Sequence, residues 1–337
     1  MKTKLKIYKL HFTTPLHIGD ERNDYSISLK TYQSDAMYAA LTSCLAKVEH
    51  TIPKDGDLGF SISSLFPFYQ EIEKDKEPEK KAVYFFPKLL KQNLPNLNDL
   101  SNAKKIKKVS WLEISLFEQM INGTLRLNDD IVQQIKGDFL CKNETYINKD
   151  FITSQVVQRV TISRDFSKDA EPFYMDRIYF IEKSGLFFIA EGDTKLLDIA
   201  LSVLKEEGIG TDRNIGNGFF NVSTDEIEIN LPESEYIANL SMFCPENETQ
   251  LADLMRDDNI AYDFTKRGGW ITTMPHNKIR KNTIHMFTPA SVFKSTIKQK
   301  EINIMGKLID LNPSATYPFV DHSIWRNGKS LFIPVKI

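Results

Sequence analysis

The stretch GIGTDRNIGNGF, residues 208–219, places four glycines within eleven residues. The preceding sequence predicts a helix that begins near Thr194 and ends at Gly208, where a glycine commonly closes a helix. A strand is expected to begin at Phe219. Glycine allows a positive φ and close approach by another backbone, and such a loop can present successive N–H groups to a phosphate. The stretch is therefore a candidate phosphate-binding loop that joins a helix to a strand.

Two familiar nucleotide-binding motifs do not fit this loop. A P-loop ends in Gly-Lys-Ser or Gly-Lys-Thr, which the stretch lacks. A dinucleotide-binding fingerprint needs a third glycine where the chain has Arg213, and it follows a strand rather than a helix. A helix cap that runs into a β-bulge would need only one or two glycines. We therefore favour a binding role for the loop over a purely structural one.

The elements around the loop predict an α+β fold. Residues 3–12 have the pattern of a first strand, and a helix is expected after Ser34, which would be its N-cap. Two apolar runs, 178–181 and 186–189, are separated by a turn and predict a hairpin. With the helix and strand on either side of the glycine-rich loop, the order becomes β-α-β-β-α-β, as in a ferredoxin-like domain. The RNA-recognition module shares this order and binds RNA on its open sheet.

A second domain is predicted to begin at residue 231, which divides the chain into residues 1–230 and 231–337. Its signals are a strand at 236–243, a helix at 247–256, a strand near 260–265, and apolar runs at 284–288 and 331–335. They are compatible with a second ferredoxin-like domain built on an antiparallel sheet. In the first domain, residues 71–81 are expected to form a charged surface loop and residues 91–108 an irregular insertion.

The composition excludes several classes of protein. A net charge of −2 argues against coating nucleic acid by charge alone, so any such contact must use local patches. Cys44, Cys141 and Cys244 are isolated, which disfavours a disulfide framework or a cysteine zinc site and favours a reducing cytoplasm. No apolar stretch is long enough for a membrane span or a signal sequence. The six histidines form no metal-binding motif and no hydrolase motif is present, so we expect no metal, no cofactor and no enzymatic activity.

A basic window lies between Phe264 and Lys300, with eight basic residues and no acidic one. The basic residues are Lys266, Arg267, Lys278, Arg280, Lys281, Lys294, Lys298 and Lys300. Such patches supply sequence-independent affinity for phosphates, and Trp270 and Phe293 are candidates to stack on bases. A solvated surface above core aromatic residues would give the same pattern. The window is therefore a candidate RNA face, with a plain surface as the alternative.

The spacing G-x-G-x5-G-x-G followed by an aromatic residue is similar to the glycine-rich loop of the RAMP superfamily of CRISPR-associated proteins. Within that superfamily, almost the whole chain resembles the family that supplies subunit four of type III-A CRISPR Csm effector complexes. The stretches that carry this resemblance are residues 14–19, 34–41, 86–88, 262–270 and 325–335.

The resemblance implies a non-catalytic RNA-binding subunit with two ferredoxin-like (RRM-like, RAMP) domains and inserted loops. Such a subunit caps the 5′ handle of the guide RNA (crRNA) and contacts the large polymerase-domain subunit and the backbone subunit of the Csm complex. The handle is expected to lie along the open sheet face and the glycine-rich loop. The residues predicted to bind RNA, from the resemblance and from the basic window, are His17, Lys88, Arg159, Arg164, Gly208, Gly210, Arg213, Gly216, Gly218, Lys266, Arg267 and Lys294.

Three alternatives stay open at this point. A repeat-processing endoribonuclease of the same superfamily would use His17 as a general base. Such enzymes carry the glycine-rich loop near the C-terminus, whereas 119 residues follow Gly218 here. The equivalent subunit of a type III-B complex would have the same role in another assembly. A ferredoxin-like interaction protein without an RNA role would leave both the loop and the basic window unexplained.

Overall fold

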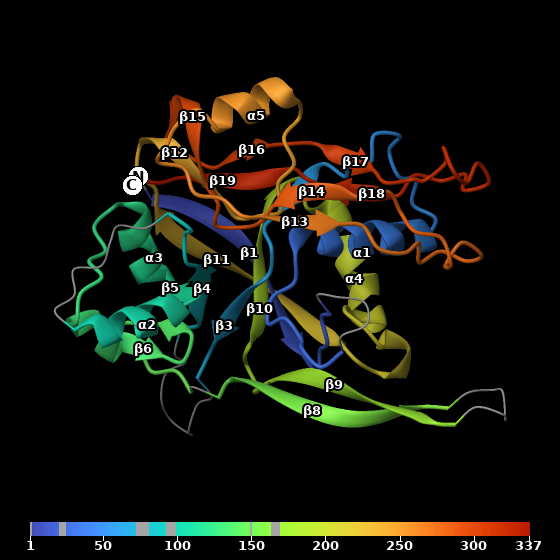
Figure 1. Cartoon of the computed structure of the whole chain (residues 1–337), viewed down its shortest axis with the longest axis horizontal. Helices are drawn as coiled ribbons and strands as arrows, with labels where there is room; N and C mark the ends of the chain where they lie inside the picture. The colour runs from blue at the N-terminus through green and yellow to red at the C-terminus, as the bar shows by residue number, and fades with distance from the viewer. Residues whose placement is uncertain (1, 20–24, 72–80, 92–98, 149, 163–168) are drawn as a thin grey trace.

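The computed structural model describes residues 2–19, 25–71, 81–91, 99–148, 150–162 and 169–337 (Figure 1). In chain order the elements are β1 (Lys2–Phe12), α1 (Ser34–Lys47), β2 (Phe60–Ile62), β3 (Phe66–Tyr69), β4 (Val83–Pro87), α2 (Leu100–Lys108), β5 (Trp111–Glu113), α3 (Ile114–Ile121), η1 (Asp130–Gln134), β6 (Ile135–Lys136), β7 (Phe139–Leu140), β8 (Ile152–Thr161), β9 (Glu171–Phe180), β10 (Gly185–Gly192), α4 (Lys195–Glu207), η2 (Arg213–Ile215), β11 (Phe220–Asn230), β12 (Ser234–Asn239), α5 (Glu248–Leu254), β13 (Phe264–Arg267), β14 (Ile284–Phe287), β15 (Val292–Gln299), β16 (Asn303–Met305), β17 (Leu308–Asp310), β18 (Trp325–Asn327) and β19 (Ser330–Pro334).

A nine-stranded sheet forms the centre of the molecule. Its strand order is β11-β1-β10-β3-β4-β5-β7-β6, and β2 also pairs with β10. β1 lies antiparallel to β11 along its whole length, from Lys2 opposite Asn230 to Phe12 opposite Phe220. The C-terminal end of β1 lies beside the N-terminal end of β11. The segment that follows β1 and the segment that precedes β11 are therefore neighbours at this end of the strands. This register brings residues 14–19 beside the glycine-rich loop.

Two helices pack against each other beside the central strands. α1 and α4 are in contact, and each buries an apolar stripe that includes Leu41 and Leu45 in α1 and Leu201 in α4. The hydroxyl of Tyr8 in β1 donates a hydrogen bond to Asp198 of α4 at 2.6 Å. The predicted first strand and both predicted helices are thus confirmed.

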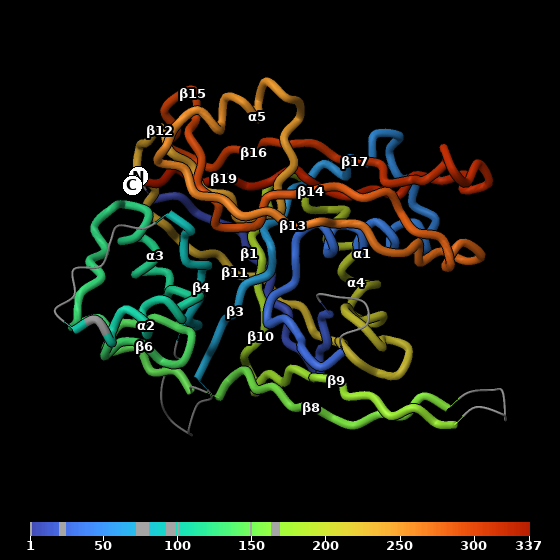
Figure 2. The backbone as a smooth tube through the Cα atoms, in the orientation of Figure 1, coloured from blue at the N-terminus to red at the C-terminus, as the bar shows by residue number. Residues whose placement is uncertain are grey.

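The predicted hairpin between residues 178–181 and 186–189 is wrong. β9 pairs with β8 over ten residues, from Ile152 opposite Phe180 to Thr161 opposite Glu171. β10 pairs with β1 on one side and with β2 and β3 on the other. The short turn between two apolar runs therefore separates strands of different sheets. The β8–β9 pair forms a two-stranded ribbon that projects from the body of the molecule (Figure 2).

The prediction of irregular structure over residues 91–108 is wrong in part, because α2 occupies its second half. The carboxylate of Asp99 caps this helix by accepting a hydrogen bond from the Ser101 N–H at 2.8 Å. Only Ile106 anchors the last turn in the core, so the sequence has too few apolar residues to show a helical period. Residues 92–98, and residues 72–80 of the predicted charged loop, lie outside the described residues.

The C-terminal part forms a second antiparallel sheet with strand order β15-β12-β19-β16. β12, α5 and β19 lie near their predicted positions, whereas β15 and β16 were not predicted. Leu240, Val292 and Leu331 belong to the same hydrophobic core as the large sheet. The two parts are therefore packed together through shared apolar residues. The domain division at residue 231 stays a prediction.

The whole arrangement is an α+β fold with several antiparallel sheets, as predicted from the sequence. All residues of β3, and β10 from Gly185 to Ala190, are buried, so both faces of the sheet are covered there. The expected open sheet face is therefore absent at these strands. Among the described residues, no helix has both the length and the apolar character needed to cross a membrane.

Candidate functional site

The glycine-rich loop begins where α4 ends. Gly208 has φ of +74°, and its N–H donates to the carbonyl of Leu204 at 2.8 Å, which closes the helix as predicted. The other three glycines, Gly210, Gly216 and Gly218, have φ of +84°, +92° and +75°. Residues with a side chain rarely adopt such angles. The short turn η2 forms the exposed tip of the loop.

Three of the four glycines are required by the chain's own backbone. A Cβ atom at Gly218 would lie 1.9 Å from the carbonyl oxygen of Ile209, and one at Gly210 would lie 2.4 Å from that of His17. A Cβ atom at Gly208 would lie 2.9 Å from the carbonyl oxygen of Asn217. Gly216 alone faces open space within 4 Å. Intramolecular packing therefore accounts for more of the motif than the sequence analysis assigned to it.

Hydrogen bonds join the loop to the turn after β1. The Thr211 N–H donates to the carbonyl of His17 at 2.9 Å, and the Gly218 N–H donates to that of Pro15 at 2.8 Å. The Phe219 N–H donates to the hydroxyl of Thr14 at 2.8 Å. The two segments, nearly 200 residues apart in sequence, thus form one structural unit. The tip of the loop is left to face outward.

His17 lies inside this unit and is only 1% exposed. Its Nδ1 is 2.7 Å from the carbonyl oxygen of Asp176 in β9, while its Nε2 is buried and has no hydrogen-bond partner in the described part of the chain. The ring therefore holds the ribbon against the turn. It offers no exposed nitrogen to RNA or to a reaction that needs a general base.

Two predicted arginines lie at the exposed side of the loop. The guanidinium of Arg159, on the ribbon strand β8, is 3.7 Å from the carboxylate of Asp212 in the loop. That of Arg213 is 3.8 Å from Glu207 at the end of α4. Both are partly exposed and only loosely paired, which leaves N–H groups available to a phosphate. Arg164, the third predicted arginine, lies outside the described residues.

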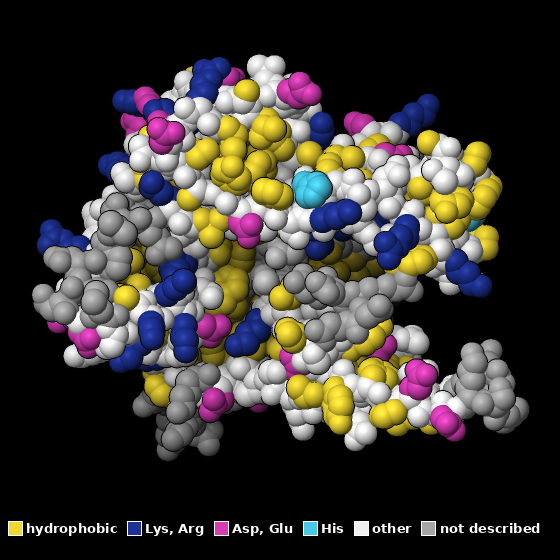
Figure 3. Space-filling model, viewed as in Figure 1, with side chains coloured by type: hydrophobic (Ala, Val, Ile, Leu, Met, Phe, Trp, Pro, Cys, Tyr) yellow, Lys and Arg dark blue, Asp and Glu magenta, His cyan; other side chains and the backbone are white. Residues whose placement is uncertain are grey.

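The first part of the basic window, residues 264–281, forms an edge of the molecule above the ribbon (Figure 1). Lys266 in β13, and Lys278 and Arg280 in the segment that follows, are exposed. The guanidinium of Arg280 lies over the ring of Trp270, 5.2 Å from its centroid. Figure 3 shows the surface hollowed between this part and the β8–β9 ribbon, with Lys and Arg side chains along the upper rim. Phe293 is fully buried, so its predicted role in base stacking is wrong.

Two other predicted RNA-binding lysines lie elsewhere and have partners in the protein. The ammonium of Lys88 donates to the carbonyl of Ile106 at 3.0 Å, at the end of α2, and burial lowers its pKa. Lys294 lies 3.4 Å from both Glu235 and Asp257. In Figure 1, α2 and β15 are both remote from the end of α4, where the glycine-rich loop begins. These two side chains serve the packing of their own elements.

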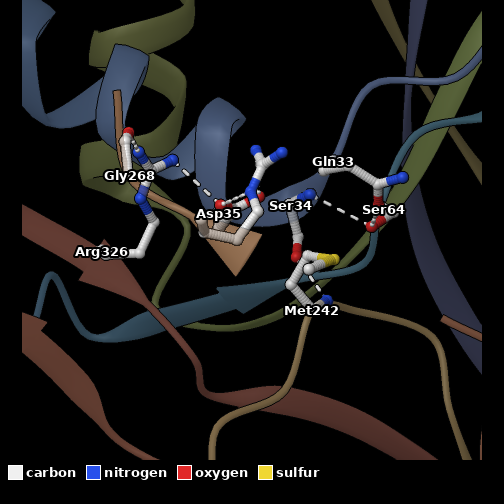
Figure 4. A network of polar contacts seen from close by, with 8 residues as sticks. Gln33, Ser34, Asp35, Ser64, Met242, Gly268 and Arg326 are labelled. Atoms are coloured by element: carbon white, nitrogen blue, oxygen red, sulfur yellow. Dashed lines mark hydrogen bonds and ion pairs between the residues drawn. The ribbon is translucent and has the colours of Figure 1, made fainter. Parts of the chain in front are cut away.

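Arg267 belongs to a buried ion-pair network that the sequence analysis did not find (Figure 4). Its guanidinium donates to both carboxylate oxygens of Asp35, at 2.8 and 3.1 Å. Arg326 of β18 donates to Asp35 at 2.9 Å and to the carbonyl of Gly268 at 3.2 Å. Burial alone would raise the pKa of Asp35, but the two guanidinium groups hold it below its usual value.

The start of α1 is fixed by the same network. Ser34 is the first helical residue rather than the N-cap, and its hydroxyl accepts a hydrogen bond from the Met242 N–H at 2.8 Å. Its own N–H donates to the hydroxyl of Ser64 at 3.1 Å. The predicted capping role of Ser34 is therefore wrong, because its side chain is used to hold the C-terminal part. Asp35 and Arg326 lie in two of the stretches that carry the family resemblance, 34–41 and 325–335. Nothing else in the sequence indicated that these two residues form an ion pair.

The described residues place Arg159 and Arg213 at the glycine-rich loop, and Figure 3 shows a hollow with Lys and Arg side chains along its upper rim. The described residues contain no group of three or more His, Cys, Asp or Glu side chains that could hold a metal ion. Exposed arginines and backbone N–H groups suit phosphates, and an aromatic ring stacked with arginine suits bases.

The sequence has relatives among characterised proteins. Residues 232–335 match the family model of the CRISPR Csm4 C-terminal domain. The CRISPR system Cms protein Csm4 of Thermococcus onnurineus is 27% identical over 66% of this chain and 71% of its own. The protein of the same name from Streptococcus thermophilus is 22% identical over 98% of this chain and 99% of its own.

Two solved structures have a similar fold. In the Csm3-Csm4 subcomplex of the type III-A CRISPR-Cas interference complex, a chain matches with a TM-score of 0.61 at 15% identity, over 99% of this chain and 100% of that one. A chain of the Csm1-Csm4 cassette in complex with AMPPNP matches with a TM-score of 0.55 at 18% identity, over 99% of both chains. Sequence and fold agree that the chain is similar to Csm4 proteins over almost its whole length. The resemblance inferred from the sequence is confirmed.

The glycine contacts predict unequal effects of two alanine substitutions. Gly216→Ala meets open space, so only its left-handed backbone should cost stability, roughly 1–2 kcal/mol. Gly218→Ala also drives a Cβ into the Ile209 carbonyl, which should add about 1–3 kcal/mol. Chemical denaturation of both variants measures the difference. Equal free energies of unfolding would contradict the packing explanation.

The ion-pair network predicts that Asp35→Asn strongly destabilises the protein. The substitution keeps the size of the side chain but leaves two guanidinium groups without their counter-charge, which should cost about 3–5 kcal/mol. The matched control is Asp321→Asn, because the Asp321 side chain is 89% exposed and should change stability by less than about 0.5 kcal/mol. Equal denaturation midpoints for the two variants would refute the role of Asp35.

Proposed function

We propose that the chain is the Csm4 subunit of a type III-A CRISPR interference complex and that it holds the 5′ handle of the guide RNA without cleaving it. The observation that carries this proposal is that Arg159 and Arg213 lie together at the glycine-rich loop, on a molecule whose surface has a hollow rimmed by Lys and Arg side chains (Figure 3). The family match supports the assembly, and the geometry supports an extended RNA ligand.

The proposed binding mode follows from the exposed groups. The arginines and the N–H groups of the tip would hold phosphates, which position the strand but carry no sequence information. Arg280 and Trp270 would offer a stacked surface to an unpaired base. Since neither β3 nor the main part of β10 has an open face, the handle would follow the hollow rather than the sheet. Recognition of a target would come from guide pairing.

The proposed partners are the two subunits found with Csm4 chains in the solved assemblies. One assembly joins Csm4 to Csm1 and another joins it to Csm3. We propose that this chain likewise bridges the large polymerase-domain subunit and the backbone subunit. A subunit that caps one end of a guide must meet both the neighbouring backbone subunit and the subunit at the end of the assembly.

A ferredoxin-like core belongs to the same proposal. The elements β1, α1, β3, β10, α4 and β11 follow one another in chain order, and the strands lie in the order β11-β1-β10-β3. This is the order expected for a β-α-β-β-α-β domain, with residues 83–180 inserted between its second and third strands. We propose that residues 1–230 are one RAMP domain and that residues 231–337 are a second, more decorated one.

A non-catalytic role is favoured over RNA processing by the position of His17. A general base must reach the proton that it removes, and both nitrogens of this buried ring are turned into the protein. The type III-B alternative lacks comparable support, because the family model and the curated relatives carry the Csm4 name.

The double variant Arg159→Ala/Arg213→Ala tests the proposed handle site. Fluorescence anisotropy would compare a guide RNA that starts with the repeat-derived handle with one whose first nucleotides are scrambled. We expect about a tenfold or greater loss of affinity for the handle RNA and a salt slope lower by roughly 0.7 per lost phosphate contact. The preference for the handle over the scrambled end should also fall.

The control for this test is Arg256→Ala, an exposed arginine next to α5 whose side chain is 66% exposed. It should bind the handle RNA like the unmodified protein. An unchanged affinity and salt slope in the double variant would remove the loop from the handle site. Repeated turnover of RNA by the pure protein would disprove the non-catalytic role.

A further inference from the structure

Positive charge is in excess around Asp35. Arg267 and Arg326 both contact this one carboxylate, and a third cation, Lys281, lies beside them. The Lys281 N–H donates to the carbonyl of Gly269 at 2.9 Å, and Arg326 donates to the carbonyl of the adjacent Gly268. Lys281 and Arg326 are therefore both bonded to the two-residue segment Gly268–Gly269, which follows β13. One anion faces three cations at this place.

The third cation has no ion-pair partner of its own among the described residues, although the charge of Asp35 acts on it and raises its pKa. In the described part of the chain, no carboxylate lies within 4.0 Å of the Lys281 ammonium group, which is half-buried. Burial, with Arg326 as the next contribution, lowers the pKa of Lys281 to about 8. Arg326 is 7% exposed, and its Nε is buried without a hydrogen-bond partner among the described residues. At neutral pH the ammonium is still mostly protonated, so the excess charge persists.

Further cations lie on the same side of the molecule as Lys281. The charges of Arg213, Asp35, Arg326 and Arg267 all act on the pKa of the buried Tyr32. Arg213 of the glycine-rich loop therefore lies on the same side of the molecule as the Asp35 ion pairs. Lys278 and Arg280, neighbours of Lys281 in the acid-free segment, are exposed cations. A half-buried charge without a partner is costly. A ligand with repeated negative charges fits this row of cations better than a single carboxylate does.

We propose that Lys281, backed by Arg326, forms a subsite for one phosphodiester of the guide RNA beside the Asp35 ion pair. This subsite rests on the proposed function and extends it from the loop to the segment that follows β13. The phosphate would complete a cluster of three cations and two anions. Asp35 would hold the two arginines, and the ligand would contact the lysine.

The subsite makes RNA affinity depend on pH. A bound phosphate favours the charged form of Lys281, so binding raises its pKa and takes up a proton. Affinity is therefore full below about pH 8 and falls as pH rises through the pKa of the free protein. Arginines stay charged in this range. The pKa of Asp35 is held low and burial raises that of Tyr32, so neither group titrates between pH 7 and pH 9.

The test measures binding of a guide RNA with the repeat-derived 5′ end to the full chain at pH 7 and pH 9, at constant ionic strength. With a pKa of about 8, the protonated fraction of Lys281 falls from about nine-tenths to about one-tenth, so affinity should drop about tenfold. Lys281→Met should bind weakly and nearly equally at both pH values. Lys281→Arg should keep its affinity at pH 9, because its charge does not titrate.

The matched control is Lys278→Met, which removes an exposed charge three residues away and should keep the drop between pH 7 and pH 9. A flat profile for the unmodified protein, or a Lys281→Met variant that retains the drop, would overturn the subsite. So would a Lys281→Met variant that binds RNA normally and instead loses its partner subunits. If the protein never prefers the handle to a scrambled end at either pH, the proposed function fails, which is a different outcome.

Discussion

The carboxylate of Asp35 joins three segments that are far apart in the sequence. It lies at the first turn of α1 and is bound by arginines 232 and 291 residues later. A buried charge persists only where it is fully paired. The start of α1, the end of β13 and β18 must therefore come together, because otherwise Asp35 and the two arginines would lose their ion-pair partners. Because α1 also packs on α4, whose last turn begins the glycine-rich loop, the position of that loop depends on this junction. The two parts of the chain therefore share a charge as well as a core.

Much of the fold could be predicted from the sequence because local patterns determine it. β1, α4 and β11 have clear periodicity, and Gly208 closes its helix with the expected positive φ. Strand partners could not be predicted, because two apolar runs with a turn between them look the same whether they pair or not. β9 found its partner in β8, which is largely polar and exposed. α2 escaped notice because a cap at Asp99 and one buried residue are enough to form it.

The site was less predictable than the fold, since it depends on which side chains meet. The glycine motif correctly marked an unusual loop, but its close contacts are with the carbonyl groups of Ile209 and His17. Arg267 was predicted to be an exposed RNA-binding cation, because the sequence does not show that the buried Asp35 lies beside it. Lysines were similarly ambiguous: Lys88 caps a helix end, whereas Lys266 is exposed. Of the residues predicted to bind RNA, Arg159 and Arg213 at the glycine-rich loop and Lys266 in β13 are exposed enough to reach a ligand.

The strand order has a consequence for how the protein is made. β1 is synthesised before its two neighbours, β10 and β11, so it has no complete set of partners until residue 230 has been synthesised. Such long-range pairing slows folding and leaves a strand edge open to other chains. Lys2 and Lys4, which meet Glu228 and Glu226 in the finished sheet, are unpaired during this wait. Lysines on an unpaired strand oppose pairing with other chains, and in the finished sheet the same two side chains pair with glutamates of β11.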